Sequence, residues 1–136
     1  MIVPIILASD KTPVNRHTGG LEMHPIFMTI SNIQSDIRMQ AMSHAWRCIV
    51  FIPLLSFKVH SNFQTILQAW VFHWLLDVII TLLKDAADQG CDLTDPSRLI
   101  RNCYTPLVAY IADLPEQQLI ACMSKNTSPI TTAELP

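Results

Sequence analysis

Residues 62–88 constrain the fold more than any other stretch, because they contain neither glycine nor proline. They carry Leu, Ala, Gln and Trp, and the next two residues are Gln89 and Gly90. A glycine directly after a helical pattern is a typical helix stop. The sequence therefore predicts one long helix here, and the other elements have to be arranged around it.

Apolar runs on both sides of this helix predict four strands. Three runs precede the helix and are joined by short turns, which favours an antiparallel meander. The helix can then serve as the crossover to a parallel fourth strand, and a second, shorter helix follows. We therefore expect an α/β fold, with one domain over residues 1–125 and a loose tail over residues 126–136. The expected strands are residues 2–9, 24–33, 46–55 and 103–112, residues 91–101 are expected to form a loop, and the second helix covers residues 114–125.

Two of the apolar runs end on an aspartate, the first on Asp10 and the last on Asp113. A carboxylate at the end of an apolar strand is costly to desolvate unless it is paired or binds a metal. Two such acids on neighbouring strands suit metal-assisted phosphodiester chemistry, which uses two cations about 3.5–4 Å apart. Alternatively, each aspartate is a turn residue that hydrogen bonds to nearby backbone. The pattern alone leaves both interpretations open.

A family resemblance extends from about Pro4 to about Thr132. The segments that carry it are PIILASDKT, RHTGGLEMHPIFMTISNIQSDIRMQAMSHAWRC, CYTPLVAYIADLPEQQLIACMSKN and SPITTA. Together they resemble the transposases of the Plavaka-type DNA transposons of fungi, which are relatives of the plant CACTA elements. The resemblance implies a ribonuclease-H-like catalytic core with an acidic triad of the DDE kind. It implies that Asp10 on the first strand and Asp113 on the fourth bind Mg²⁺ or Mn²⁺, and that the intact protein binds DNA.

The implied reaction is DNA strand cleavage and transfer, in the nucleus or the cytoplasm. The third acid of such enzymes lies further downstream, and after Glu116 this sequence has only Glu134, in a tail rich in Pro and Thr. We therefore expect an incomplete, truncated or relic core that is inactive by itself. In the segment Asp95-Pro96-Ser97-Arg98, the family usually has a glycine where Arg98 stands, so a positive φ there would strain the arginine.

The composition argues against some other functions. The formal net charge is −2 and the basic residues are scattered, which counts against efficient DNA binding by this chain alone. No two of its four cysteines have CxxC spacing, so a zinc knuckle is not expected. A signal peptide requires basic residues before its apolar run, and the short apolar run at this N-terminus has none. The cysteines are Cys48, Cys91, Cys103 and Cys122.

The predicted long helix is apolar around most of its circumference, which leaves two further functions open. Residues 66–83 are long enough to span a membrane, but Asp77 near their centre costs about 2.5–3.5 kcal/mol, and we expect no membrane partner. The stronger alternative is a non-enzymatic interaction module, which offers a packing surface to a partner or associates with itself through this helix. We expect the face with Trp70 and Trp74 to cover the sheet. The residues expected to remain exposed are Phe72, Leu76, Ile79 and Leu83.

Overall fold

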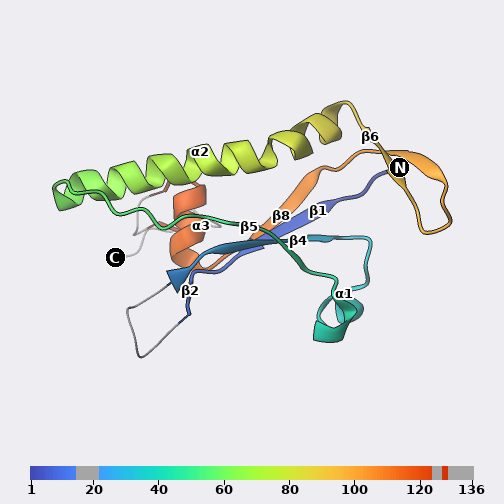
Figure 1. Ribbon diagram of the computed structural model, residues 1–136, viewed down its shortest axis with the longest axis horizontal. Helices are drawn as coiled ribbons and strands as arrows, with labels where there is room; N and C mark the ends of the chain where they lie inside the picture. Colours follow the sequence, from blue (N-terminus) through green and yellow to red (C-terminus); the bar gives the residue numbers. More distant parts are fainter. Residues whose placement is uncertain (15–21, 124–126, 129–136) are drawn as a thin grey trace.

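The computed structural model describes residues 1–14, 22–123 and 127–128, and it shows a mixed sheet beside a long helix (Figure 1). The sheet has four strands in the order β5-β4-β1-β8. Strand β1 pairs antiparallel with β4 and parallel with β8, and β4 pairs antiparallel with β5. The predicted meander, crossover helix and parallel fourth strand are therefore confirmed. The elements are β1 (Ile5–Ser9), β4 (Pro25–Ile30), β5 (Arg47–Phe51), α2 (Ser61–Asp88), β8 (Leu107–Ile111) and α3 (Leu114–Ile120).

A proline limits the length of β5. Strand β5 ends at Phe51, two residues before Pro53, which has no N–H group to donate to a neighbouring strand. Strand β2 (Thr12–Pro13) pairs antiparallel with β3 (Glu22–Met23) just beyond the ends of β1 and β4. The predicted tail, residues 126–136, lies outside the described residues except for residues 127 and 128.

Short elements occupy connections that were expected to be irregular. A helical turn, α1 (Ser35–Arg38), and a 3-10 turn, η1 (Ala41–Ser43), lie between β4 and β5. The loop predicted for residues 91–101 is wrong, because β6 (Cys91–Thr94) and β7 (Ile100–Cys103) form an antiparallel hairpin there. Each of these strands has only four residues, which is too short for an alternating pattern to stand out.

The turn of this hairpin places Arg98 in the left-handed region, with φ at 64°. Its N–H donates to the Asp95 carbonyl at 2.9 Å, and the Asp95 carboxylate accepts from the N–H of Leu99 at 2.9 Å. The hydrogen bonds from Leu99 and Arg101 hold the pKa of Asp95 below its usual value. The turn therefore requires a positive φ at the position where the resemblance led us to expect glycine.

We expect Arg98→Gly to stabilise the protein by about 1 kcal/mol, because the left-handed conformation costs an L-residue about 1–2 kcal/mol and glycine's greater freedom when unfolded offsets part of that gain. Urea unfolding of both proteins measures the difference. The neighbouring substitution Ser97→Gly serves as control and should not stabilise, because Ser97 has no positive φ. A loss of stability in Arg98→Gly would contradict the strain argument.

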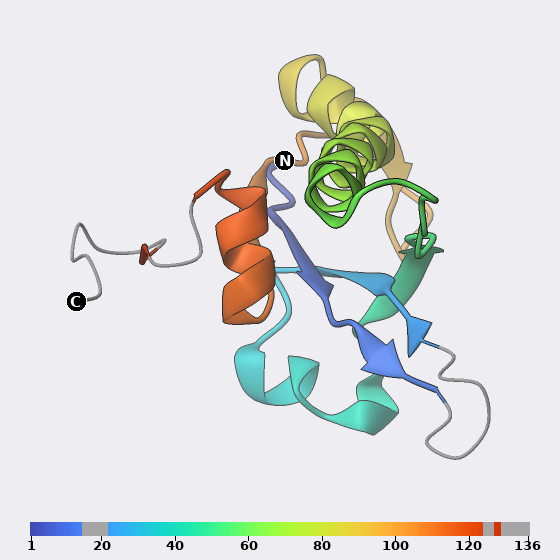
Figure 2. The same cartoon turned by 90° about the vertical axis from the view of Figure 1, so that its left-hand side faces the viewer.

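Helix α2 lies along one face of the sheet, and the core forms between them (Figure 2). Phe72 and Leu76 are buried against Ile5, Leu7 and Ile26 of the sheet. The predicted orientation of the helix is therefore wrong. Phe72 and Leu76 are 7% and 8% exposed, and Ile79 and Leu83 also pack against the core.

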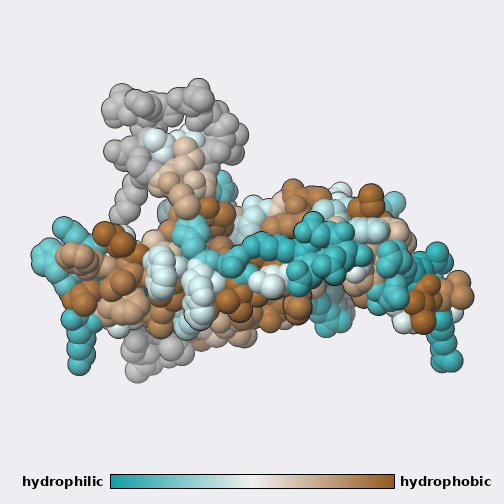
Figure 3. Space-filling view, turned by 90° about the horizontal axis from the view of Figure 1, so that it is seen from above, coloured by the Kyte–Doolittle hydropathy of each residue, from teal (hydrophilic) through white to brown (hydrophobic). Residues whose placement is uncertain are grey.

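The exposed side of α2 carries large apolar side chains, which we call the outer patch. Figure 3 looks onto this side of the molecule and shows hydrophobic side chains at the surface beside a hydrophilic band. By length and composition α2 meets the criterion for a membrane-spanning helix, which core helices of soluble proteins also meet. Here its inner side covers the sheet. The outer patch consists of Phe63, Ile66, Trp70, Trp74, Val78 and Leu82, all at least half exposed.

Candidate functional site

Asp10 directly follows β1, and Asp113 lies two residues after the end of β8, the parallel neighbour of β1. The last pair in the β1–β8 register is Ala8 with Ile111. Continuing this register by two residues on each strand brings Asp10 opposite Asp113. Both side chains lie at the surface of the molecule. The fold therefore brings the two predicted acids to the same edge of the sheet, although about 100 residues separate them in the sequence.

Each aspartate also makes the local hydrogen bond that a turn residue would make. The Asp10 carboxylate accepts from the Thr12 hydroxyl at 3.0 Å. The Asp113 carboxylate caps α3 by accepting from the N–H of Glu116 at 3.0 Å. A carboxylate has two oxygens and several lone pairs, so these bonds leave room for a cation.

A metal ion bound at this edge of the sheet would have two carboxylate ligands, Asp10 and Asp113, from the described part of the chain. Within residues 1–14, 22–123 and 127–128, no three His, Cys, Asp or Glu side chains come close enough together to hold a metal ion. Mg²⁺ is usually held by one or two carboxylates, with waters and substrate phosphates completing its shell. Asp10 and Asp113 fit that pattern, but not a cage built only from protein ligands.

A third carboxylate, Glu116, is buried next to this edge. It is 7% exposed, and its Oε1 accepts from the Ser9 hydroxyl at 2.5 Å. The same oxygen lies 3.0 Å from Nε2 of His24, whose side chain is 9% exposed. The His24 ring in turn stacks on Phe72 of α2, with centroids 5.9 Å apart. We call Ser9, His24 and Glu116 the buried polar cluster.

The charge on Glu116 is maintained by its hydrogen bonds. Burial raises the pKa of this carboxyl, but the hydrogen bonds from His24 and Ser9 outweigh burial, so the pKa lies below its usual value. Burial also raises the pKa of the neighbouring Tyr110 hydroxyl, and the charge of Glu116 acts in the same direction. At neutral pH the buried polar cluster therefore contains an ionised carboxylate.

The sequence did not predict this cluster. Glu116 lies in the first turn of α3, where an acid usually places its charge at the helix N-terminus, but its side chain is buried instead. In a capping box, an acid at this position reaches back to the backbone of the cap residue. The Asp113–Glu116 spacing is a signal of such a cap, and it does not identify Ser9 or His24 as partners of Glu116.

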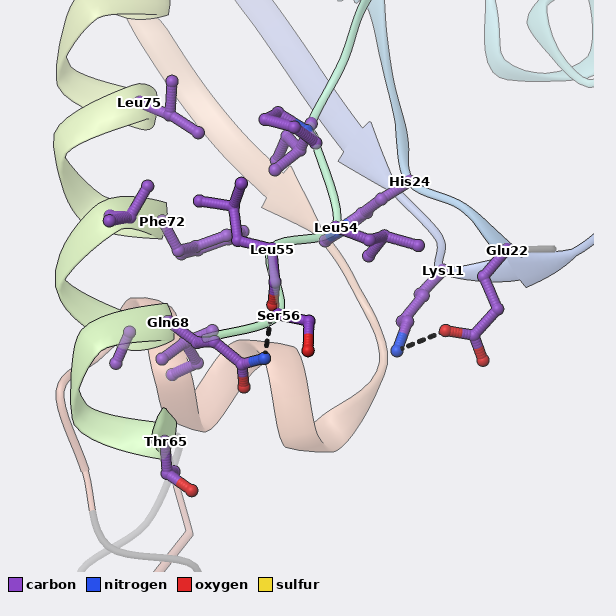
Figure 4. Close-up of a pocket in the computed structure, with 15 residues that line it drawn as sticks. Lys11, Glu22, His24, Leu54, Leu55, Ser56, Thr65, Gln68, Phe72 and Leu75 are labelled. Atoms are coloured by element: carbon purple, nitrogen blue, oxygen red, sulfur yellow. Dashed lines mark hydrogen bonds and ion pairs between the residues drawn. The ribbon is translucent and has the colours of Figure 1, made fainter. Parts of the chain in front are cut away.

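A pocket of about 440 Å³ lies beside the cluster, between α2 and the segment that follows β5 (Figure 4). Its walls are mostly apolar, with Leu54, Leu55 and Phe72 among the lining residues, and His24 lines it as well. At its rim, Lys11 and Glu22 form an ion pair at 2.7 Å. Because Lys11 directly follows Asp10, this pocket opens close to the edge that carries the two aspartates.

Comparison with known proteins identifies one family. A family model described as Plavaka transposase matches residues 1–135, nearly the whole chain. No curated protein and no solved structure matches the chain. The matched residues include both aspartates and the buried polar cluster.

Proposed function

The chain belongs to the Plavaka transposase family, and on this basis we propose that it forms part of a DNA transposase catalytic core with a ribonuclease-H-like fold. The observation that carries the proposal is the parallel pairing of β1 with β8, which brings Asp10 and Asp113 to one edge. The strand order β5-β4-β1-β8 with α2 as crossover supports the same core. In this proposal residues 1–125 form the core, residues 126–136 are a tail, and the protein acts on DNA in the nucleus.

Asp10 and Asp113 would hold Mg²⁺ or Mn²⁺ in this site. When bound, such cations activate the attacking oxygen and stabilise the leaving oxygen during phosphodiester cleavage. The two carboxylates would hold the cation in place, and positioning of the reacting groups is a large part of such rate enhancements. Since the chain has a net charge of −2, we propose that DNA binding by the intact protein depends on basic groups elsewhere.

We expect Asp10→Asn and Asp113→Asn each to weaken Mn²⁺ binding at least about tenfold, or about 1.4 kcal/mol. An amide keeps the size of the carboxylate but removes the charge that attracts the cation. Titration calorimetry measures the affinity. Asp36→Asn, an exposed acid on α1, is the matched control and should leave binding unchanged. Equal affinities in all four proteins would refute the metal site.

The purified chain is expected not to cut DNA. A metal site with two acidic ligands holds its ions weakly, and loose positioning of the reacting groups costs rate steeply. The assay is incubation with Mn²⁺ and supercoiled plasmid, followed by separation of nicked from intact circles. Nicking by the unaltered chain that disappears in Asp10→Ala would show that this expectation is wrong.

The outer patch favours a second candidate function, a protein-interaction module. Ile66, Trp70 and Trp74 follow one another at four-residue spacing, and the same spacing continues through Val78 and Leu82. Such a ridge fits into the matching groove of a second copy at a crossing angle of about −50°. We propose that the chain associates with itself through this ridge, with or without cation binding at the aspartates.

A further inference from the structure

The buried polar cluster has a member close in sequence to each of the two proposed metal ligands. Ser9 is the last residue of β1 and directly precedes Asp10. Glu116 lies three residues after Asp113, and its N–H is bound by the Asp113 carboxylate. Through its side chain and its main chain, Glu116 therefore contacts the elements that carry both aspartates.

A single oxygen of Glu116 links α3 to the end of β1 and to the residue before β4. It accepts from Ser9 of β1 at 2.5 Å and lies 3.0 Å from Nε2 of His24, which directly precedes β4. His24 stacks on Phe72, so the connection continues to α2, while Glu116 itself belongs to α3. Burying a carboxylate is costly, and bonds to charged groups are roughly twice as strong as neutral ones. Because the buried carboxylate of Glu116 depends on its bonds to Ser9 and His24, these bonds hold α3 at a fixed separation from β1 and β4.

We propose that Glu116 is a positioning residue that sets the separation of the Asp10 and Asp113 carboxylates without touching the cation. This inference rests on the proposed metal site. Removing a group that hydrogen bonds to a metal ligand and orients it usually lowers the affinity for the metal about 10–100-fold. Removing the Glu116 carboxylate releases Ser9 from α3, so Asp10 and Asp113 lose their shared support.

The test compares Glu116→Ala and Glu116→Gln with the unaltered chain. We expect Glu116→Ala to weaken Mn²⁺ binding at least about tenfold. Glu116→Gln should recover most of that loss, because its amide oxygen still accepts from Ser9 and His24. Leu83→Ala is the matched control, since it removes core packing on α2 away from the cluster and should not change Mn²⁺ affinity.

Amide hydrogen exchange provides a readout that needs no metal. We expect faster exchange in Glu116→Ala at residues 8–10 and 113–117, and not along α2. Unchanged exchange and unchanged affinity would overturn the positioning role. If the unaltered chain binds no Mn²⁺, the metal site fails by itself, and the exchange data alone then decide for or against positioning. Should Glu116→Ala not fold, Ser9→Ala removes one bond of the cluster and takes its place, with the same expected changes.

Discussion

Phe72→Ala is expected to destabilise the protein by about 3–5 kcal/mol, the usual cost of removing a buried aromatic side chain. Phe72 is 7% exposed, packs in the core between α2 and the sheet, and stacks on His24. The substitution therefore leaves a cavity and removes the support of the buried polar cluster. Urea unfolding monitored by circular dichroism measures the loss.

Trp74→Ala is the matched control on the same helix. Trp74 is larger than Phe72 but 57% exposed, so its removal should change stability by no more than about 0.5 kcal/mol. Both variants are compared at low micromolar concentration, where self-association contributes little. A larger loss in Trp74→Ala than in Phe72→Ala would mean that α2 packs on its tryptophan face.

The double substitution Trp70→Glu with Trp74→Glu is expected to weaken self-association at least about 100-fold, since buried tryptophans are frequent centres of binding energy. Aromatic side chains offer about 150–250 Å² each. At exposures of 57–68%, Phe63, Trp70 and Trp74 therefore supply roughly 300–450 Å², about half of the 800 Å² that each subunit of a typical interface buries. The other apolar residues of the outer patch, at exposures of 54–78%, add to this area.

Light scattering at tens of micromolar distinguishes the outcomes. The unaltered chain should form dimers or larger species, and the double variant should be a monomer with the same circular dichroism spectrum. Leu99→Glu with Ile100→Glu introduces the same charges at exposed apolar positions in the β6–β7 hairpin and should still associate. A monomeric unaltered chain that binds no apolar dye would exclude the interaction module. Association that persists in the double variant would assign it to another surface.

The order of the elements was predictable because the hydrophobic period changes along the chain. Short apolar runs are followed by the 28 residues of α2, which contain no glycine or proline. After β8, a proline and an acid mark the first turn of α3. Once that order is known, handedness and crossover rules leave few topologies. The neighbouring positions of Asp10 and Asp113 follow from the topology, so this part of the candidate site was predictable too.

The inner face of α2 was predicted wrongly. The prediction gave more weight to the large tryptophan side chains than to the positions of the charged residues. At about 100° per residue, Asp77, Lys84 and Asp88 lie on the side opposite Phe72, Leu76 and Ile79. Charged side chains must remain in water, so they determine which face is buried. The Asp77–Lys84 ion pair is exposed in the structure, as this argument requires. A few charges therefore decided the orientation of a helix that is otherwise apolar nearly all around.

The buried polar cluster could not be predicted for a different reason. Its members lie far apart in the sequence, since 92 residues separate His24 from Glu116. Only the finished sheet brings them together. A serine at a strand end, a histidine before a proline and a glutamate in a first helical turn are each ordinary in isolation. Their shared role arises from packing, which local patterns do not describe.

The parallel pairing of β1 with β8 also determines how the chain acquires its structure. Ile5 pairs with Leu107, a separation of 102 residues (107 − 5), whereas β1, β4 and β5 follow one another closely. Contacts between distant residues slow folding, because a long loop must close before they form. One edge of β1 has its partner only in β8, so that edge cannot pair before the C-terminal part of the sheet is present. The two aspartates therefore come together only when this long-range pairing forms.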